Sequence, residues 1–456
     1  MKYTIKAPVL AVAAVFTLSG CNLLDVNNPN SLTEESVQLP AASNGVANGS
    51  LRKVADAVSE VWQTTGVASD ELFWTGSRDG WNTLDQGAID EPRNEFLDAV
   101  FPELGTAVWM ADNALGILTQ HVADNPGVAG FERDLARAYF FNGIALLITG
   151  ETQEDMTFSD KMEDGEPVGP ANMFTVLDDA IANLNEAVTR FGALGEDDLQ
   201  TAALAVRARA HMSRAIWNVL NPGAAVGGAL DFGQGAVDAA AVLAAVGTED
   251  YLYQFGFSSS ASDCSMCSWI NLRGENQVQG RRPDDPARAN NLIALTTSGT
   301  GASGRMTDGD SVNVILLDPV SGDPDPAVKR MVDRFGVDQY GSLTLASARL
   351  MRLILAEQAL FAGGGAAFDT HINALRAFDD KDPFGGEVSE LAILQHERRI
   401  NTLFMGLRLQ DMYRWGITDD RWLSTNTAIT APGTMMPITI VELRANCHLN
   451  EQPCPG

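Results

Sequence analysis

Residues 70–90 combine aromatic and polar side chains in a way that suggests ligand binding. The segment reads DELFWTGSRDGWNTLDQGAID and has no helical stripe long enough to fold by itself. An indole offers a flat apolar face to the C–H face of a sugar ring, while carboxylates, amides and guanidinium groups can bond to the ring hydroxyls. We therefore predict a glycan-binding loop whose contact residues are Asp70, Trp74, Arg78, Asp79, Trp81 and Asn82. The alternative is that one or both tryptophans anchor the loop to the protein body, because tryptophan is usually highly buried.

Two further aromatic residues could complete such a site from a distant part of the chain. Tyr253 and Trp269 lie outside any predicted helix, on either side of the closely spaced Cys264 and Cys267. We expect them to form the wall opposite the loop once the chain folds. Whether they converge on it depends on the fold.

The residues that usually mark catalysis show no functional spacing. No Gly-x-Ser-x-Gly, phosphate-binding or dinucleotide-binding motif is present, and no HExxH motif is formed by the histidines, which are His121, His211, His371, His396 and His448. A glycoside hydrolase would need two carboxylates beside a sugar cleft, but 59 acidic residues offer too many pairs for any one to be informative. We predict a protein that is not an enzyme and holds no metal or cofactor. A helical glycoside hydrolase is the enzymatic alternative.

One aspartate-rich segment could hold calcium. Asp318–Asp325 supplies carboxylates, but it lacks the spacing of an EF-hand loop. We expect it to be a solvated turn.

The N-terminus has the features of an export signal. The charged start MKYTIK precedes a short apolar run, Ala7–Leu18, which leads into Ser19-Gly20-Cys21. This arrangement resembles the lipobox of bacterial lipoproteins, so we predict that residues 1–20 are removed, that Cys21 is acylated and that residues 21–40 form a tether. The alternative is an ordinary signal peptide with a chance cysteine. Several acyl chains would give a stable membrane anchor.

The charge of the chain disfavours several classes of partner. Its formal net charge is −28 at pH 7, whereas binding to phosphate groups needs clustered lysine and arginine. We therefore expect no nucleic acid partner, and attachment to the membrane through lipid rather than through electrostatics.

Four cysteines follow Cys21, an even number in a chain that we expect to leave the cytoplasm. Exported thiols oxidise readily, so disulfides are predicted. Local pairing of Cys264 with Cys267 and of Cys447 with Cys454 is favoured over cross-pairing, although the sequence leaves the connectivity open. A zinc site that uses these cysteines and His448 is the alternative.

Long amphipathic patterns predict a mainly α-helical protein with tetratricopeptide-like helix pairs. Small residues in FERDLARAYFFNGIALL and TAALAVRARAHM would let neighbouring helices approach closely, although a plain helical bundle is the alternative. We expect a single domain over 41–456, with helical repeats at about 42–220 and 343–416 and an irregular, loop-rich insertion at about 221–342. The predicted helices cover residues 42–63, 95–122, 131–149, 173–191, 199–220, 343–361, 366–378 and 388–415.

Near the C-terminus, the stretch ERRINTLFMGLRLQDMYRWG places charges beside an apolar helix face. Glu397, Arg408 and Asp411 project onto or next to the face that carries Ile400 and Leu407. Burial of unpaired charges costs several kcal/mol each, so we predict that these three residues form a buried, hydrogen-bonded charge cluster. A catalytic carboxylate is the alternative.

Several segments, in chain order, resemble the SusD/RagB family of outer-membrane nutrient-binding lipoproteins. They are CNLLDVNNPNSLTEESV, ERDLARAYFFNGIALLITGE, ASARLMRLILAEQALFAGG, ERRINTLFMGLRLQDMYRWG, and Met436-Pro437-Ile438 followed by Glu442. Two positions depart from the family pattern. Gly150-Glu151-Thr152-Gln153 replaces the usual Gly-Asp-Val-Pro, and Asn373-Ala374-Leu375-Arg376 replaces Asn-x-Ile-Arg. The first departure bears on ligand specificity more than on fold.

The resemblance implies a helical body with four tetratricopeptide-like pairs on one side and a loop-rich ligand surface on the other. In the family, the helical repeats are associated with contacts to a TonB-dependent transporter, and glycans lie against loop aromatics. The resemblance therefore implies a lipid-anchored outer-membrane protein at the cell surface that binds an oligosaccharide, or another oligomeric nutrient, and delivers it to a SusC-like transporter. The alternative from another class is a helical-repeat scaffold for envelope proteins that binds no small ligand.

Overall fold

A computed structural model describes residues 34–160, 163–221, 226–278, 316–335, 338–450 and 452–454, together with two short strands at 293–295 and 312–314. The predicted signal peptide, Cys21 and most of the predicted tether lie outside the described residues. No helix in the described part of the chain is both long enough and apolar enough to span a membrane.

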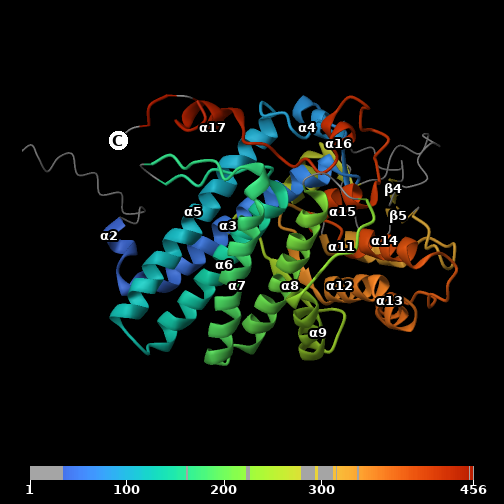
Figure 1. Cartoon of the computed structure of the whole chain (residues 1–456), viewed down its shortest axis with the longest axis horizontal. Coiled ribbons are helices and arrows are strands. Elements are labelled where there is room, and N and C mark those ends of the chain that lie inside the picture. The colour runs from blue at the N-terminus through green and yellow to red at the C-terminus, as the bar shows by residue number, and fades with distance from the viewer. Residues whose placement is uncertain are drawn as a thin grey trace, which may run out of the picture.

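Most of the described chain is helical, which confirms the predicted mainly α fold class (Figure 1). The longer helices are α3 (Ser43–Ala68), α5 (Glu95–Asp124), α6 (Ala129–Thr152), α7 (Phe174–Leu194), α8 (Asp197–Leu220), α9 (Gln234–Val246), α11 (Pro326–Phe335), α12 (Ala348–Phe361), α13 (Ala366–Phe378), α14 (Glu390–Asn401) and α15 (Arg408–Trp415). The shorter ones are α2 (Glu34–Val37), η1 (Pro40–Ala42), α4 (Asp79–Asp85), η2 (Pro170–Asn172), α10 (Ser265–Cys267), the π-helix η3 (Ser268–Arg273), α16 (Thr427–Thr430) and α17 (Ile440–Ala445).

The long helices pack against one another largely in chain order. Helix α3 contacts α5, α5 contacts α6, α6 contacts α7, α7 contacts α8, and the series continues through α9 and α12 to α13. Figure 1 shows α3, α5, α6, α7 and α8 side by side. Glycines allow the close approach of α6 and α7, because a Cβ atom at Gly143 would lie 2.8 Å from Leu184 and one at Gly150 would lie 2.7 Å from Leu177. This layer is the scaffold on which the loops are mounted.

Three two-stranded antiparallel sheets fasten the loop-rich segments to this scaffold. They pair β1 (Leu72–Trp74) with β3 (Asn276–Val278), β2 (Leu252–Phe255) with β6 (Leu343–Ser347), and β4 (Ile293–Leu295) with β5 (Val312–Val314). In the first sheet Trp74 stands opposite Asn276. This pairing joins the predicted glycan loop to a segment 200 residues further along the chain.

Some elements differ from the sequence predictions. Residues 343–347 form β6 rather than the start of a helix, because they pair with β2. The region expected to be irregular contains α9, and the predicted loop contains α4. Helix α9 was missed because its alanine-rich sequence carries no clear apolar stripe.

The predicted C-terminal helix is interrupted between α14 and α15. Phe404 has φ 60° and Gly406 has φ 71°, and neither value fits a right-handed helix. A Cβ atom at Gly406 would lie 2.3 Å from a ring carbon of Trp62, so this turn packs directly on the indole. Leu403 and Phe404 are buried in this turn rather than on a helix face.

The charged residues of this stretch are buried, yet they do not pair with one another as a single cluster. Glu397 Oε1 accepts hydrogen bonds from Arg376 and Lys381, at 3.0 and 2.7 Å. The carboxylate of Asp411 lies between Arg398 and Arg414, and Arg408 pairs with Asp70. The predicted cluster is therefore corrected to three separate ion networks, each of which connects this stretch to another part of the fold.

The segment Asp318–Asp325 forms the expected turn with residues 321–324 exposed, but the carboxylates at its two ends are not solvated. Asp318 and Asp325 are almost fully buried. Arg376 donates two hydrogen bonds to Asp318, at 2.8 and 2.9 Å, while Lys381 and His396 lie 3.0 and 2.8 Å from Asp325 Oδ2. The carboxylate oxygens that a calcium ion would bind thus already face cationic or hydrogen-bonding side chains.

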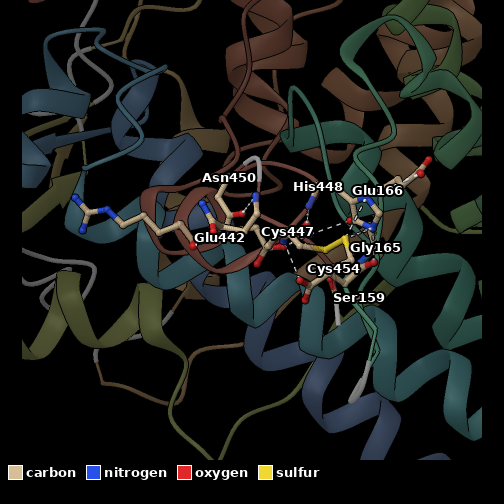
Figure 2. Close-up of a disulfide and its surroundings, with 12 residues drawn as sticks. Ser159, Gly165, Glu166, Glu442, Cys447, His448, Asn450 and Cys454 are labelled. Carbon is tan, nitrogen blue, oxygen red and sulfur yellow. Dashed lines mark hydrogen bonds and ion pairs between the residues drawn. A yellow bond between two sulfur atoms is a disulfide. The ribbon is translucent and has the colours of Figure 1, made fainter. Parts of the chain in front are cut away.

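The cysteines pair locally, as Cys264 with Cys267 and Cys447 with Cys454. Figure 2 shows the second disulfide beside His448 and Glu166. Next to it, the backbone N–H of Cys447 donates to Asp164 at 2.9 Å, and the Asn446 amide donates to the carbonyl of Gly165 at 2.9 Å. These bonds fasten the C-terminal segment to the loop that follows α6. Because the four cysteines are oxidised in this structure, the zinc alternative is not supported.

Candidate functional site

The predicted loop and the segment that carries Trp269 come together in the structure. Besides the β1–β3 pairing, the backbone N–H of Thr75 donates to the carbonyl of Glu275 at 3.0 Å. The rings of Trp81 and Trp269 meet edge to face with their centroids 5.5 Å apart. The chain thus brings together two aromatic segments whose convergence the sequence left open.

Trp81 is buried below the surface that the predicted loop forms with the segment of Trp269. This position corrects its assignment as a ligand contact. Its side chain is only 1% exposed, and its ring stacks on Phe96 at a centroid distance of 3.6 Å and an interplanar angle of 12°. Asn94 caps helix α5 by accepting a hydrogen bond from the N–H of Phe96, which holds that ring in place. A ligand cannot stack on Trp81 while these rings are packed, so Trp81 is an anchor of the loop.

Asp70 is also structural rather than available to a ligand. Its oxygens accept hydrogen bonds from Arg408 at 2.5 and 2.8 Å, and Arg399 lies 3.3 Å away. The two guanidinium groups hold the pKa of the carboxyl well below its usual range despite its burial. The residue ties the start of the loop to α14 and α15.

The remaining predicted residues near this surface are accessible. Trp74, Asn82 and Trp269 are half-buried, whereas Arg78 and Asp79 are exposed. We call these five residues, with Arg273 and Glu275, the tryptophan cluster.

Sequence reasoning missed Arg273 and Glu275, which the fold adds to this surface. The guanidinium carbon of Arg273 lies 4.3 Å from the ring centroid of Trp269. Glu275 accepts hydrogen bonds from the N–H of Arg78 at 3.3 Å and from the Ser77 hydroxyl at 3.2 Å. Only their position beside Trp269 in the sequence could have pointed to them.

Tyr253 does not join the tryptophan cluster, contrary to our expectation. Its ring packs near Phe140 and Phe255, with centroid distances of 5.3 and 6.3 Å. It lines a cavity of about 630 Å³ between α3, α6 and β2, and no residue of the tryptophan cluster lines that cavity.

The buried Arg421 holds the predicted loop in position through hydrogen bonds. Arg421 donates to both oxygens of Asp419 and also bonds to Asp85 at the end of α4. A terminal nitrogen of the same guanidinium lies 3.3 Å from the carbonyls of Ser69 and Leu72, which flank the start of β1. Arg421 therefore fixes α4 relative to β1, the two elements that present Trp74 and Asn82.

Glu71, at the start of β1, is a buried carboxyl group with incomplete hydrogen bonding. Its Oε1 atom accepts a bond from the N–H of Phe404 at 3.1 Å, while Oε2 has no partner in the described part of the chain. Burial raises the pKa of Glu71 to about 8, and the neighbouring charge of Asp70 acts in the same direction. The carboxyl is therefore mostly protonated in the folded protein at pH 7.

We expect the free energy of unfolding to decrease as the pH rises from 6.5 to 8. Over this range the folded protein retains a proton on Glu71 that the unfolded chain has released, because the ordinary pKa of this group is 4.5. The folded state thus binds more protons, and stability falls as pH rises. Glu60, whose pKa burial raises to about 7, acts in the same direction. His211 and His371, whose pKa values burial lowers, oppose the trend in the lower part of this range, where the unfolded chain still protonates a fraction of each imidazole.

Urea denaturation at pH 6.5 and at pH 8 measures this decline. Glu71→Gln keeps an acceptor for the N–H of Phe404 but does not titrate, so its decline should be smaller than that of the wild type. Equal declines in the two proteins would show that Glu71 does not carry the proton.

Comparison with known proteins was made by sequence and by structure. No family model and no curated protein matches the sequence. A SusD superfamily protein from Bacteroides vulgatus superimposes with a TM-score of 0.58 at 13% identity, over 90% of this chain and 98% of its own. Another from Bacteroides thetaiotaomicron has a TM-score of 0.59 at 12% identity, over 90% and 97% of the two chains.

The chain has the SusD fold. A third structure with this fold, surface glycan-binding protein A from Bacteroides uniformis, has a TM-score of 0.58 at 11% identity, over 89% of this chain and 98% of its own. In the three superpositions the SusD fold covers 89–90% of this chain.

Proposed function

We propose that this protein is a lipid-anchored outer-membrane member of the SusD family that binds an oligosaccharide. Binding rather than catalysis is the proposed activity. The observation that carries the proposal is the tryptophan cluster, because a SusD-fold chain here joins accessible indoles and hydrogen-bonding side chains from two distant segments. A similar fold occurs in a protein whose name describes it as a surface glycan-binding protein.

The cluster suits a ring-shaped, hydroxyl-rich ligand. Trp74 and Trp269 would contact the apolar faces of sugar rings, while Arg78, Asp79 and Asn82 would bond to hydroxyl groups. Arg78 is paired with Glu95, and the two side chains are both 46% exposed. Ion pairs this exposed are weak, so the side chains can rearrange around a ligand at low cost.

Delivery to a TonB-dependent, SusC-like transporter is the second part of the proposal. Acylation of Cys21 would hold the protein at the outer membrane, and residues 21–40 would let the folded body move over its partner. The helix layer of α3, α5, α6, α7 and α8 would contact the transporter and leave the tryptophan cluster free for the ligand. Isolation of a transporter with the tagged protein from detergent-solubilised membranes tests this part separately.

The scaffold alternative makes a different statement about the tryptophans. It expects the loop tryptophans to be packed inside the protein, which holds fully for Trp81 but only in part for Trp74 and Trp269, which are half-buried and pack against the core. The accessible pair therefore favours ligand binding. Incubation of the protein with glycans, followed by chromatography of the products, tests the hydrolase alternative.

We expect Trp74→Ala and Trp269→Ala each to weaken glycan binding at least about tenfold, which corresponds to about 1.4 kcal/mol of lost stacking. Isothermal titration of residues 22–456 against a panel of neutral oligosaccharides measures the effect. Trp217→Ala is the matched control, since Trp217 is also half-buried but packs against Phe174 on the helix layer. A wild type that binds no member of the panel, or variants that bind as tightly as the wild type, would contradict the proposal.

A further inference from the structure

The cavity that contains Tyr253 has the size and shape of a ligand site separate from the tryptophan cluster. Its volume of about 630 Å³ lies within the range of small-molecule sites, about 300–1,000 Å³. It is formed by the N-terminal halves of α3 and α6, by the first turn of α8 and by β2. The residues that the argument uses are Asn48, Arg52, Arg133, Arg137, Phe141 and Tyr253.

The charged side chains that line this cavity are all cationic. Three arginines line it, and its described lining contains no aspartate or glutamate. The whole chain carries a formal charge of −28, with 59 acidic and 31 basic residues. Each arginine also pairs with a carboxylate outside the lining, namely Asp56, Glu196 and Asp134. The charged groups that face the cavity itself are nevertheless all cationic, which favours an anion there.

The arginines keep donors available for such an anion. Arg133 Nε bonds to Glu196 at 2.6 Å, and the Arg133 side chain is 44% exposed. Arg52 pairs with Asp56 through one terminal nitrogen, and that side chain is 28% exposed. Both pairs are only partly buried, and each guanidinium has five N–H donors, so both groups can bind an additional carboxylate or sulfate.

The third arginine is held more firmly. Arg137 donates to Asp134 at 3.1 Å and also to Asn48, while its guanidinium carbon lies 5.6 Å from the ring centroid of Phe141. It is thereby oriented before any ligand arrives, which reduces the entropy lost on binding.

Aromatic residues provide the apolar part of the wall. Phe141 is buried and Tyr253 is half-buried, and both line the cavity with the arginines. Aromatic faces suit ring C–H groups, whereas guanidinium groups suit carboxylate or sulfate. The combination matches a sugar that carries negative charge better than it matches a neutral sugar or a simple ion.

We propose that this cavity is a second binding site, and that it takes an anionic oligosaccharide bearing carboxylate or sulfate groups. The proposal does not depend on the tryptophan cluster, because the two sites share no residue. The carboxylate and sulfate forms present the same chemistry to the arginines, and separate probes distinguish them.

The test uses residues 22–456 and three probes: an α-1,4-linked galacturonic acid trimer, the neutral α-1,4-linked galactose trimer, and a sulfated galactose trimer. At least one anionic trimer should bind, and more tightly than the neutral trimer. Arg133→Gln and Arg137→Gln should each weaken its binding at least about fivefold, and added salt should weaken binding to the wild type because charge pairing is screened. The exposure of Arg133 makes its variant safe for folding, and thermal unfolding checks both variants.

Two controls separate this proposal from the proposed function. Arg214→Gln removes a surface arginine that pairs with Asp178 on the helix layer, and it should bind the anionic trimer as the wild type does. Trp74→Ala, which alters the tryptophan cluster, should also leave this binding unchanged. The proposal is overturned if neither anionic trimer binds, if Arg133→Gln and Arg137→Gln bind it as tightly as the wild type, or if Trp74→Ala abolishes the binding.

Discussion

Trp81→Ala is expected to lower the free energy of unfolding by about 3–5 kcal/mol, the usual cost of deleting a large aromatic side chain from a packed core. The indole stacks on Phe96 and meets Trp269 edge to face, so its removal would take a packing partner from both rings. Helix α4 would lose its main apolar contact with α5. Chemical denaturation followed by circular dichroism gives the difference between the variant and the wild type.

Trp217→Ala is the control for this prediction, because Trp217 is half-buried and should lose less stability. Loss of glycan binding in Trp81→Ala is expected only as a consequence of the disordered loop. If Trp81→Ala were as stable as the wild type and yet bound no glycan, Trp81 would be a ligand contact and its assignment as an anchor would be wrong.

Arg408→Ala is expected to destabilise the protein by about 3 kcal/mol, because it leaves the buried carboxylate of Asp70 with a weaker partner. This loss of stability is at the lower end of the range for a broken buried ion pair, because Arg399 remains 3.3 Å from Asp70. Glycan affinity of the folded variant should stay close to that of the wild type, because Arg408 is itself buried and lies beneath the loop. Denaturation and titration on the same preparation measure both quantities.

Arg214→Ala is the control for Arg408→Ala, because Arg214 pairs with the exposed Asp178 and its loss should cost less than that of the buried Arg408. A fully stable Arg408→Ala protein that no longer binds its glycan would show that the C-terminal stretch takes part in ligand binding. The assignment of this stretch to a purely structural role would then be wrong.

The long helices could be predicted from the sequence because their information is local. In α5 the apolar residues recur at helical spacing, and Asn94 marks its start, so the predicted range 95–122 lies close to the observed Glu95–Asp124. The interruption at Phe404 and Gly406 could not be found in this way. It depends on contacts with Trp62 and Glu71, which are more than 300 residues away in the chain.

The candidate site was predicted only in part for the same reason. Residue types alone identified Trp74, Arg78 and Trp269, since they are unusual outside helices. They did not distinguish the accessible Trp74 from the buried Trp81, because burial is decided by Phe96 and Trp269 after folding. Tyr253 has the same chemistry as the other aromatics, but the β2–β6 pairing places it in a different cavity.

The sequence also predicted that the charges of the C-terminal stretch are buried and paired, but it did not predict their partners. Charges beside the apolar face that carries Ile400 and Leu407 correctly indicated buried ion pairs. Their partners come from other helices and loops, namely Arg376 for Glu397 and Asp70 for Arg408. No helical spacing could reveal such distant partners.

Hydroxyl-radical labelling of residues 22–456, with and without a bound neutral oligosaccharide, tests the central claim most directly. Mass spectrometry reports the oxidation of each aromatic side chain. The proposed function predicts that the glycan protects Trp74 and Trp269, while the labelling of Tyr253 and of the control Trp217 does not change. Unchanged labelling of Trp74 and Trp269 in a protein saturated with glycan would contradict the claim that the tryptophan cluster is the binding site.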